Sequence, residues 1–213
     1  MNTLILCNGS YGSLDWYTNK AEAYDFIICV DGAAAVARKL ALKPHVLIGD
    51  MDSILPADKA FMKNSGVKIV EYPSEKNETD TMLALLTAMD QGATEVTIWG
   101  GTGSRLDHTI SNLYSVSTLT QKGIPVIFES PSETIHVINS ALRLKGEPGD
   151  TVSLLVLSDL ATGITLSGFK YPLNNATLEL NWQWAVSNVI EVRDPLIELI
   201  SGTLAVIHYH IPV

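Results

Sequence analysis

The first 130 residues alternate between two hydrophobic patterns. Short, continuous apolar runs such as Phe26–Val30 are typical of buried strands, and most are followed by a stretch with helical spacing. The clearest helix begins at an N-cap, Thr79 or Asp80, and ends before Gly92. Alternating strands and helices predict an α/β domain over residues 1–130, with a mainly parallel, doubly wound sheet. The predicted strands cover residues 3–7, 26–30, 45–50, 67–72, 95–99 and 125–129, and the predicted helices cover 32–42, 56–64, 78–92 and 107–123.

The helical pattern stops near residues 129–133. Short β-type runs follow, separated by turn-forming segments such as Gly146–Asp150. Many short strands with turns between them predict an all-β sandwich over residues 131–213. We therefore expect two domains, one α/β and one all-β.

The composition, with 46% hydrophobic and 17% charged residues, is typical of a well-packed globular protein. The net charge of −9 argues against a nucleic-acid partner, because such proteins need a basic face. It is compatible with a phosphate-binding enzyme, since carboxylates can hold a divalent cation that in turn holds phosphates. An acidic field also favours a cationic substrate.

The two cysteines, Cys7 and Cys29, lie in apolar runs, which indicates buried thiols in a reducing compartment. The first residues lack the basic region of a signal peptide, and no apolar run approaches membrane-spanning length. These features predict a cytoplasmic protein without a membrane partner.

Small polar and acidic residues cluster where the predicted strands end. The strand at 26–30 runs into Asp31 and Gly32, and the strand at 45–50 runs into Asp50 and Asp52. Because the carboxyl ends of parallel strands meet at one edge of a sheet, these residues are expected to border one ligand crevice.

Asp50 and Asp52 are two positions apart, which in an extended chain places both carboxylates on one side, roughly 6.5–7 Å apart. Such a pair can bracket Mg²⁺, although an Asp at a strand end or a helix start is also an ordinary cap. Asp31 and Asp80 are expected at the same edge. Four clustered carboxylates repel one another, and a bound cation is the usual remedy.

The segment Gly100–Arg105 is a glycine-rich turn between a strand and a helix. Glycine lets backbone N–H groups approach an anion, and the guanidinium of Arg105 suits phosphate. Asp107 and His108 follow directly, either as residues of the first helical turn or beside the phosphates.

Trp182 and Trp184 are also two positions apart, so in a strand they share a face. They either pack in a core or interface or form an aromatic wall for a flat or cationic ring.

In order and spacing, these motifs resemble the motif series of thiamine pyrophosphokinases over nearly the whole chain. The matching segments are DGAA (31–34), IGDMDS (48–53), KNETDT (76–81), GGTGSRLDHTISN (100–112), GFKYPL (168–173) and VSN (186–188). Two positions depart from the family pattern: Asn77 replaces the usual acid, and Ser104 replaces the second glycine of a Gly-Gly-Arg.

The resemblance implies a homodimeric enzyme that transfers the pyrophosphoryl group of ATP to the hydroxyl of thiamine, giving thiamine diphosphate and AMP. It implies Mg²⁺ and ATP in the α/β domain, and thiamine where that domain meets the β domain of the other subunit.

The metal residues that the resemblance implies are Asp50, Asp52 and Asp80. The implied catalytic residues are those three with Arg105 and Asp107. The implied ATP site contains Asp31, Gly32, Gly101, Thr102, Gly103, Ser104, Arg105 and His108. The implied thiamine site contains Asp80, Ser187, Asn188 and a tryptophan, either Trp182 or Trp184.

This activity agrees with the residues themselves, because phosphoryl-type transfer depends on positioning and charge neutralisation. Either Asp80 or Asp107 would orient or deprotonate the thiamine hydroxyl. The alternatives are an Asp-x-Asp metal-dependent nucleotide-sugar transferase, a phosphohydrolase with an aspartyl nucleophile, and a non-catalytic protein that binds thiamine or a nucleotide.

Overall fold

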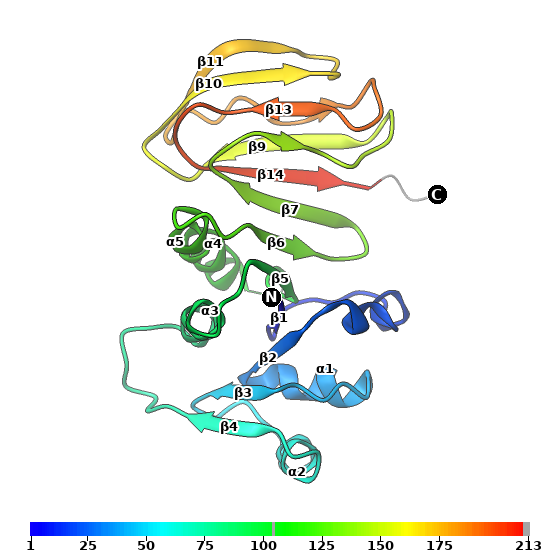
Figure 1. The fold of residues 1–213 in the computed structure, drawn as a ribbon, viewed down its shortest axis with the longest axis vertical. Helices are drawn as coiled ribbons and strands as arrows, with labels where there is room; N and C mark the ends of the chain where they lie inside the picture. The colour runs from blue at the N-terminus through cyan, green and yellow to red at the C-terminus, as the bar shows by residue number, and fades with distance from the viewer. Residues whose placement is uncertain (104, 211–213) are drawn as a thin grey trace. The chain divides into compact units, whose positions relative to one another are not determined.

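The computed structural model describes residues 1–103 and 105–210, which form two compact units (Figure 1). Unit 1 consists of Met1–Leu119 and Phe128–Pro131. Unit 2 consists of Thr120–Ile127 and the chain from Ser132 onward. Among the described residues, the helices end by Thr120, and the chain from Val126 onward is built from strands, as Figure 1 shows by colour.

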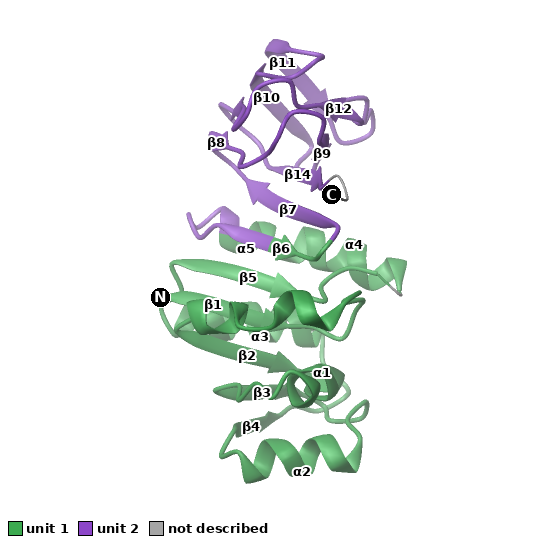
Figure 2. Cartoon of the chain, turned by 90° about the vertical axis from the view of Figure 1, so that its right-hand side faces the viewer, with its two compact units in different colours: residues 1–119, 128–131 green, residues 120–127, 132–213 purple. Residues whose placement is uncertain are grey.

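Unit 1 is the predicted α/β fold. Its strands lie in the order β5-β1-β2-β3-β4, and every neighbouring pair is parallel (Figure 2). The strands are β1 (Asn2–Leu6), β2 (Phe26–Val30), β3 (Val46–Gly49), β4 (Lys68–Glu71) and β5 (Glu95–Trp99). The strand β6 (Val126–Glu129) is divided between the units, with Val126 and Ile127 in unit 2. The helices are α1 (Ala34–Lys39), α2 (Pro56–Asn64), α3 (Asp80–Asp90), α4 (Leu106–Ser115) and α5 (Ser117–Thr120), with the 3₁₀ turns η1 (Leu14–Tyr17), η2 (Lys20–Ala23) and η3 (Asp31–Ala33).

The central strands are buried on both faces, which explains why they read as continuous apolar runs. Alternate residues such as Leu4 and Leu6 pack with Ala34 and Ala37 of α1 and Met62 of α2 in one core. α1 packs against α2, and α3 packs against α4 and the strands β1, β2 and β3. Two helical layers therefore hold the sheet and leave its strand ends available for loops.

Two helices are shorter than their sequence pattern predicts. The helix expected over 32–42 is a 3₁₀ turn followed by the six-residue α1, and Ala41 just beyond it adopts a φ of +54°. The helix expected over 107–123 divides into α4 and α5 at Val116. In both regions apolar spacing continues past the point where the backbone turns.

Unit 2 is the predicted β-sandwich. Strands β7, β14, β9 and β12 pair in that order, and a second sheet has the order β11-β10-β13-β8, with antiparallel neighbours in both. Residues of both sheets, including Leu154, Ile164, Ile197 and Val206, share one core. The strands are β7 (Glu133–Ile138), β8 (Leu142–Arg143), β9 (Thr151–Val156), β10 (Leu160–Ser167), β11 (Leu173–Glu179), β12 (Asn188–Val189), β13 (Leu196–Glu198) and β14 (Leu204–Tyr209).

Within residues 1–103 and 105–210, no helix has the length and apolar character needed to cross a membrane.

Both cysteines are buried, as predicted, and burial suppresses their ionisation. It raises the pKa of Cys7 to about 12 and that of Cys29 well above its ordinary value. Because the thiolate is the reactive form, we expect neither thiol to react with iodoacetamide at pH 8 until the protein is unfolded. The folded state holds the Cys7 proton more tightly than the unfolded state, so this contribution to stability is present below pH 9.0 and is lost as the pH rises toward 12.

Mass spectrometry of the alkylated protein, with and without guanidinium, checks this expectation. Modification of both cysteines in folded protein within minutes would contradict it.

Candidate active site

The site lies where the strand order of unit 1 reverses. From β1 the chain proceeds to β2 on one side, and β5 lies on the other side of β1. The loops that leave β1 and β5 are therefore neighbours, and the Gly9 amide donates a 2.8 Å hydrogen bond to the Gly100 carbonyl. Open α/β sheets bind ligands at such switch points, outside the carboxyl ends of the strands.

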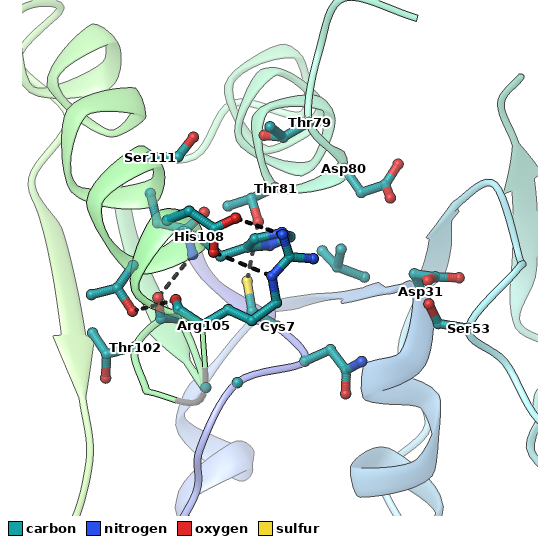
Figure 3. Close-up of a pocket in the computed structure, with 18 of the residues that line it drawn as sticks. Cys7, Asp31, Ser53, Thr79, Asp80, Thr81, Thr102, Arg105, His108 and Ser111 are labelled. Carbon is teal, nitrogen blue, oxygen red and sulfur yellow. Dashed lines mark hydrogen bonds and ion pairs between the residues drawn. The ribbon is translucent and has the colours of Figure 1, made fainter. Parts of the chain in front are cut away.

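A pocket of about 590 Å³ opens at this edge, entirely within unit 1. Figure 3 shows Asp31 and Ser53 on one side and Thr102 on the other, with Arg105 extending between them. Of the residues predicted for catalysis, metal or ATP, the pocket is lined by Asp31, Asp50, Asp52, Asp80, Gly101, Thr102, Gly103, Arg105, Asp107 and His108.

Asp31, Asp50 and Asp52 form a carboxylate cluster in this pocket, with one oxygen of each within 4.8 Å of the others. The Asp52 amide donates a 3.2 Å hydrogen bond to Asp50 Oδ1, which holds the turn that carries both acids. Asp31, which the family resemblance places on the nucleotide side, thus lies with the pair that it assigns to the metal.

Asp80 lines the same pocket but is paired with a cation of its own chain. Its Oδ1 lies 3.1 Å from Nζ of Lys76, which lies four residues earlier in the loop before α3. The N-cap of α3 is Thr79, whose Oγ1 accepts from the Met82 amide, so Asp80 is not the cap. Capping therefore does not account for the carboxylate of Asp80.

Unusual backbone geometry supports the carboxylate cluster. Asp31 and Met51 adopt φ values of +42° and +66°, which residues other than glycine rarely adopt. Gly49 has a φ of +153°, and a Cβ there would lie 2.8 Å from Asp31 Cβ. Glycine at position 49 is thus what allows the end of β3 to approach Asp31.

The electrostatics of the cluster fit a hard divalent cation. Burial, followed by the negative charges of Asp52 and Asp50, raises the pKa of Asp31. Among the described residues, its buried Oδ1 has no hydrogen-bond partner. The Asp52 amide, followed by the Ser74 hydroxyl, lowers the pKa of Asp50. Mg²⁺ prefers oxygen ligands, and the cluster offers closely spaced carboxylate oxygens, of which Asp31 Oδ1 has no hydrogen-bond partner among the described residues.

The glycines of the second loop are required by packing. A Cβ on Gly101 would lie 2.6 Å from the Phe128 ring, and a Cβ on Gly103 would lie 2.3 Å from Ser10 Oγ. The predicted residue Ser104 lies outside the described residues. Gly32 does not line the pocket, and a Cβ there would meet the side chain of Asn8.

Arg105 and Asp107 form an exposed ion pair at the start of α4, with Arg105 Nη2 2.5 Å from Asp107 Oδ2. This hydrogen bond lowers the pKa of Asp107 and raises that of Arg105. Asp107 is therefore an arginine partner in the first turn of α4 rather than its N-cap, which is Arg105. His108 lines the pocket beside this pair.

The residues predicted to contact thiamine, apart from Asp80, all belong to unit 2. Trp182 and Trp184 are 70% and 47% exposed, so neither is a core residue. Ser187 has a φ of +58° and its amide donates to Ser153 Oγ. The Asn188 side chain bonds the amide and the carbonyl of Tyr171, which fixes the GFKYPL segment to β12.

Several pocket residues were not predicted from the sequence. Asn8 follows β1 at the switch point, where the position after a central strand was the available signal. Asn112 donates a 2.8 Å hydrogen bond to the Gly101 carbonyl and so supports the loop from within. The remaining unpredicted lining residues are Cys7, Gly9, Val30, Ser53, Thr79, Thr81, Gly100, Thr109 and Ser111.

Two family descriptions match the chain. The thiamin pyrophosphokinase catalytic domain matches residues 17–128, more than half of the sequence, and the thiamin pyrophosphokinase vitamin B1 binding domain matches residues 135–204. The chain belongs to the thiamin pyrophosphokinase family. The two matches cover the α/β and all-β parts in turn.

Curated relatives agree with this family. The chain is 26% identical to the thiamine pyrophosphokinase of Bacillus subtilis strain 168 over 186 residues, covering 86% of this chain and 87% of that protein. It is 25% identical to thiamine pyrophosphokinase 1 of Oryza sativa subsp. japonica, over 72% of this chain and 61% of that protein.

Solved structures of the family share the fold. The crystal structure of the Bacillus subtilis thiamine pyrophosphokinase has a TM-score of 0.85 at 23% identity, with full coverage of both chains. The thiamin pyrophosphokinase of Candida albicans has a TM-score of 0.80 at 19% identity, covering 98% of this chain and 88% of that chain. Family membership does not favour a nucleotide-sugar transferase, an aspartyl phosphohydrolase or a non-catalytic binder.

Proposed function

We propose that this chain is a thiamine pyrophosphokinase, which transfers the β,γ-pyrophosphoryl group of ATP to the hydroxyl of thiamine and releases AMP. The observation that supports this most directly is the pocket at the switch point. It brings a carboxylate cluster and an arginine-bearing loop together, in a chain that matches both domains of the family.

In this proposal Asp31, Asp50 and Asp52 hold Mg²⁺, which neutralises charge on the polyphosphate when bound. Arg105 turns from Asp107 toward the phosphates and spreads the charge that develops during transfer. His108 and the residues from Gly101 to Gly103 border the nucleotide.

Asp80 is our candidate for the residue that orients the thiamine hydroxyl. Asp107 is the alternative candidate, because it lines the same pocket from the first turn of α4. Asp80 projects from the first turn of α3 and lines the pocket that also contains the carboxylate cluster.

We also propose that the enzyme is a homodimer whose thiamine site takes an exposed tryptophan from unit 2 of the second copy. The exposure of Trp182 and Trp184 and the vitamin B1 binding domain match over residues 135–204 support this assignment.

Trp184→Ala is expected to raise the KM for thiamine about tenfold, through loss of stacking and cation–π contact, with the KM for ATP unchanged. Trp182→Ala is the matched comparison. The tryptophan whose substitution leaves the KM for thiamine unchanged is the one that does not stack on thiamine.

A mixing experiment tests the shared site. An Asp52→Asn chain is refolded with a chain altered at the stacking tryptophan. In each mixed dimer, one of the two active sites would then contain both unaltered parts. Activity is then expected to recover to about a quarter of wild type. A monomer by light scattering, or no recovery in a confirmed mixed dimer, would remove the shared-site model.

The activity itself is tested with ATP, Mg²⁺ and thiamine. We expect AMP release from ATP that requires thiamine, and no UDP release when UDP-glucose replaces ATP. Folded protein without thiamine-dependent AMP release would overturn the proposal.

A further inference from the structure

A second group of metal-ligating side chains lies in unit 2, apart from the pocket described above. His208 is near the end of β14, and His210 follows two positions later, so both rings point to the same side of the sheet. Asp150 immediately precedes β9, which pairs with β14 so that His208 lies opposite Val152. The fold thus joins residues that are 58 positions apart in sequence.

The three side chains, Asp150, His208 and His210, are here called the His–Asp cluster. Each offers one ligand atom, and these atoms all lie within 4.8 Å of one another. His208 Nε2 is 2.7 Å from Asp150 Oδ2, and the two imidazole rings stand edge to face with centroids 4.5 Å apart.

Neighbouring groups orient these ligands. The Glu147 amide donates a 3.0 Å hydrogen bond to Asp150 Oδ2, which fixes the carboxylate in the turn before β9. Thr134 Oγ1 is 2.9 Å from His210 Nε2, which fixes that ring. Metal-binding side chains are commonly oriented by hydrogen bonds from neighbouring groups.

Burial differs within the cluster in a way that suits an ion. His208 is 2% exposed and Asp150 is 7% exposed, so water competes little for their ligand atoms. His210 is only partly buried, which leaves an approach from solvent. Three protein ligands and one open position are a common arrangement for Zn²⁺.

We propose that Asp150, His208 and His210 bind a transition-metal ion of the Zn²⁺ class, which ties the end of β14 to the turn before β9. Two imidazole nitrogens and one carboxylate favour Zn²⁺ or Co²⁺ over Mg²⁺, which takes oxygen ligands. This chemistry separates the His–Asp cluster from the carboxylate cluster of unit 1.

The competing explanation is that a proton holds the cluster together, as a buried ion pair between His208 and Asp150. An ion pair of this kind needs no metal and would leave the protein indifferent to Zn²⁺. The two explanations therefore differ in the number of metal ions bound per chain. They also differ in whether substitution of His210, which lies outside that pair, affects Zn²⁺ binding.

The test uses the tag-free chain of residues 1–213 in excess Mg²⁺, which occupies oxygen-ligand sites, and titrates it with Co²⁺ or Zn²⁺. We expect one ion per chain by calorimetry, a visible Co²⁺ absorption band, and a melting temperature that rises with Zn²⁺ concentration. His210→Gln is expected to weaken binding at least tenfold and to abolish the Zn²⁺-dependent rise.

Three further variants make the result specific. His45→Gln is the matched control, because His45 is an exposed histidine of unit 1 that lies outside the cluster, and binding should persist. Asp52→Asn should also retain the ion, which separates this site from the carboxylate cluster. Asp150→Asn should lose it, and circular dichroism of each variant confirms that it is folded.

No saturable binding by the wild-type protein in excess Mg²⁺ would overturn the proposal. Binding that persists unchanged in folded His210→Gln and Asp150→Asn proteins would overturn it equally, because the ion would then lie elsewhere. Neither outcome bears on pyrophosphoryl transfer, in which the His–Asp cluster has no proposed part.

Discussion

Asp52→Asn is expected to lower kcat/KM for AMP formation about 100- to 1,000-fold, the range seen when one charge-stabilising group is removed from a preorganised site. The substitution removes a negative charge but keeps the shape of an exposed side chain, so the fold should be unaffected. Because Asp31 and Asp50 remain, the Mg²⁺ concentration needed for half-maximal rate should rise. Initial rates across a Mg²⁺ series measure both effects.

Asp90→Asn is the matched control for this experiment. Asp90 is an exposed aspartate at the end of α3 and does not line the pocket. Its substitution makes the same change in net charge and should leave rate and Mg²⁺ dependence unaltered. Full Mg²⁺-dependent activity in Asp52→Asn would show that the carboxylate cluster is not the metal site.

Gly49→Ala is expected to damage both stability and activity. Its Cβ would lie 2.8 Å from Asp31 Cβ, at a φ that disfavours any side chain, so β3 and Asp31 must move apart. The strain costs roughly 1–3 kcal/mol in the free energy of unfolding. A displacement of about 1 Å in the cluster costs on the order of 100-fold in kcat/KM. Denaturant unfolding and steady-state rates on the same preparation check the two effects.

Gly66→Ala separates backbone strain from the steric effect. Gly66 also has a positive φ, +76°, but nothing lies within 4 Å of the position of its Cβ. It should lose about 1 kcal/mol of stability and retain its activity. If Gly49→Ala loses no more activity than Gly66→Ala, the close approach of β3 to Asp31 is not needed for function.

The strands of unit 1 could be predicted because burial on both faces makes them continuously apolar, and the parallel sheet then places their ends at one edge. On this basis we expected Asp31, Asp50, Asp52 and Asp80 at one edge of the sheet, and all four line the pocket there. It did not determine which three oxygens converge, because that depends on the positive φ of Asp31 and on Gly49.

Other features lay beyond the reach of sequence patterns. The glycines of the Gly100–Arg105 loop suggested close approach to an anion, whereas Gly101 and Gly103 are constrained by Phe128 and Ser10 from distant segments. The end of α1 also escaped prediction, because apolar spacing continues to Leu42 although the backbone turns at Ala41.

The central claim is the transfer of a pyrophosphoryl unit, and ATP labelled with ³²P at the γ-phosphate tests it most directly. In the presence of Mg²⁺ and thiamine, we expect the label to appear in thiamine diphosphate while an equal amount of unlabelled AMP is released. Label in thiamine monophosphate with release of ADP would contradict the account, as would labelled inorganic phosphate with no thiamine product.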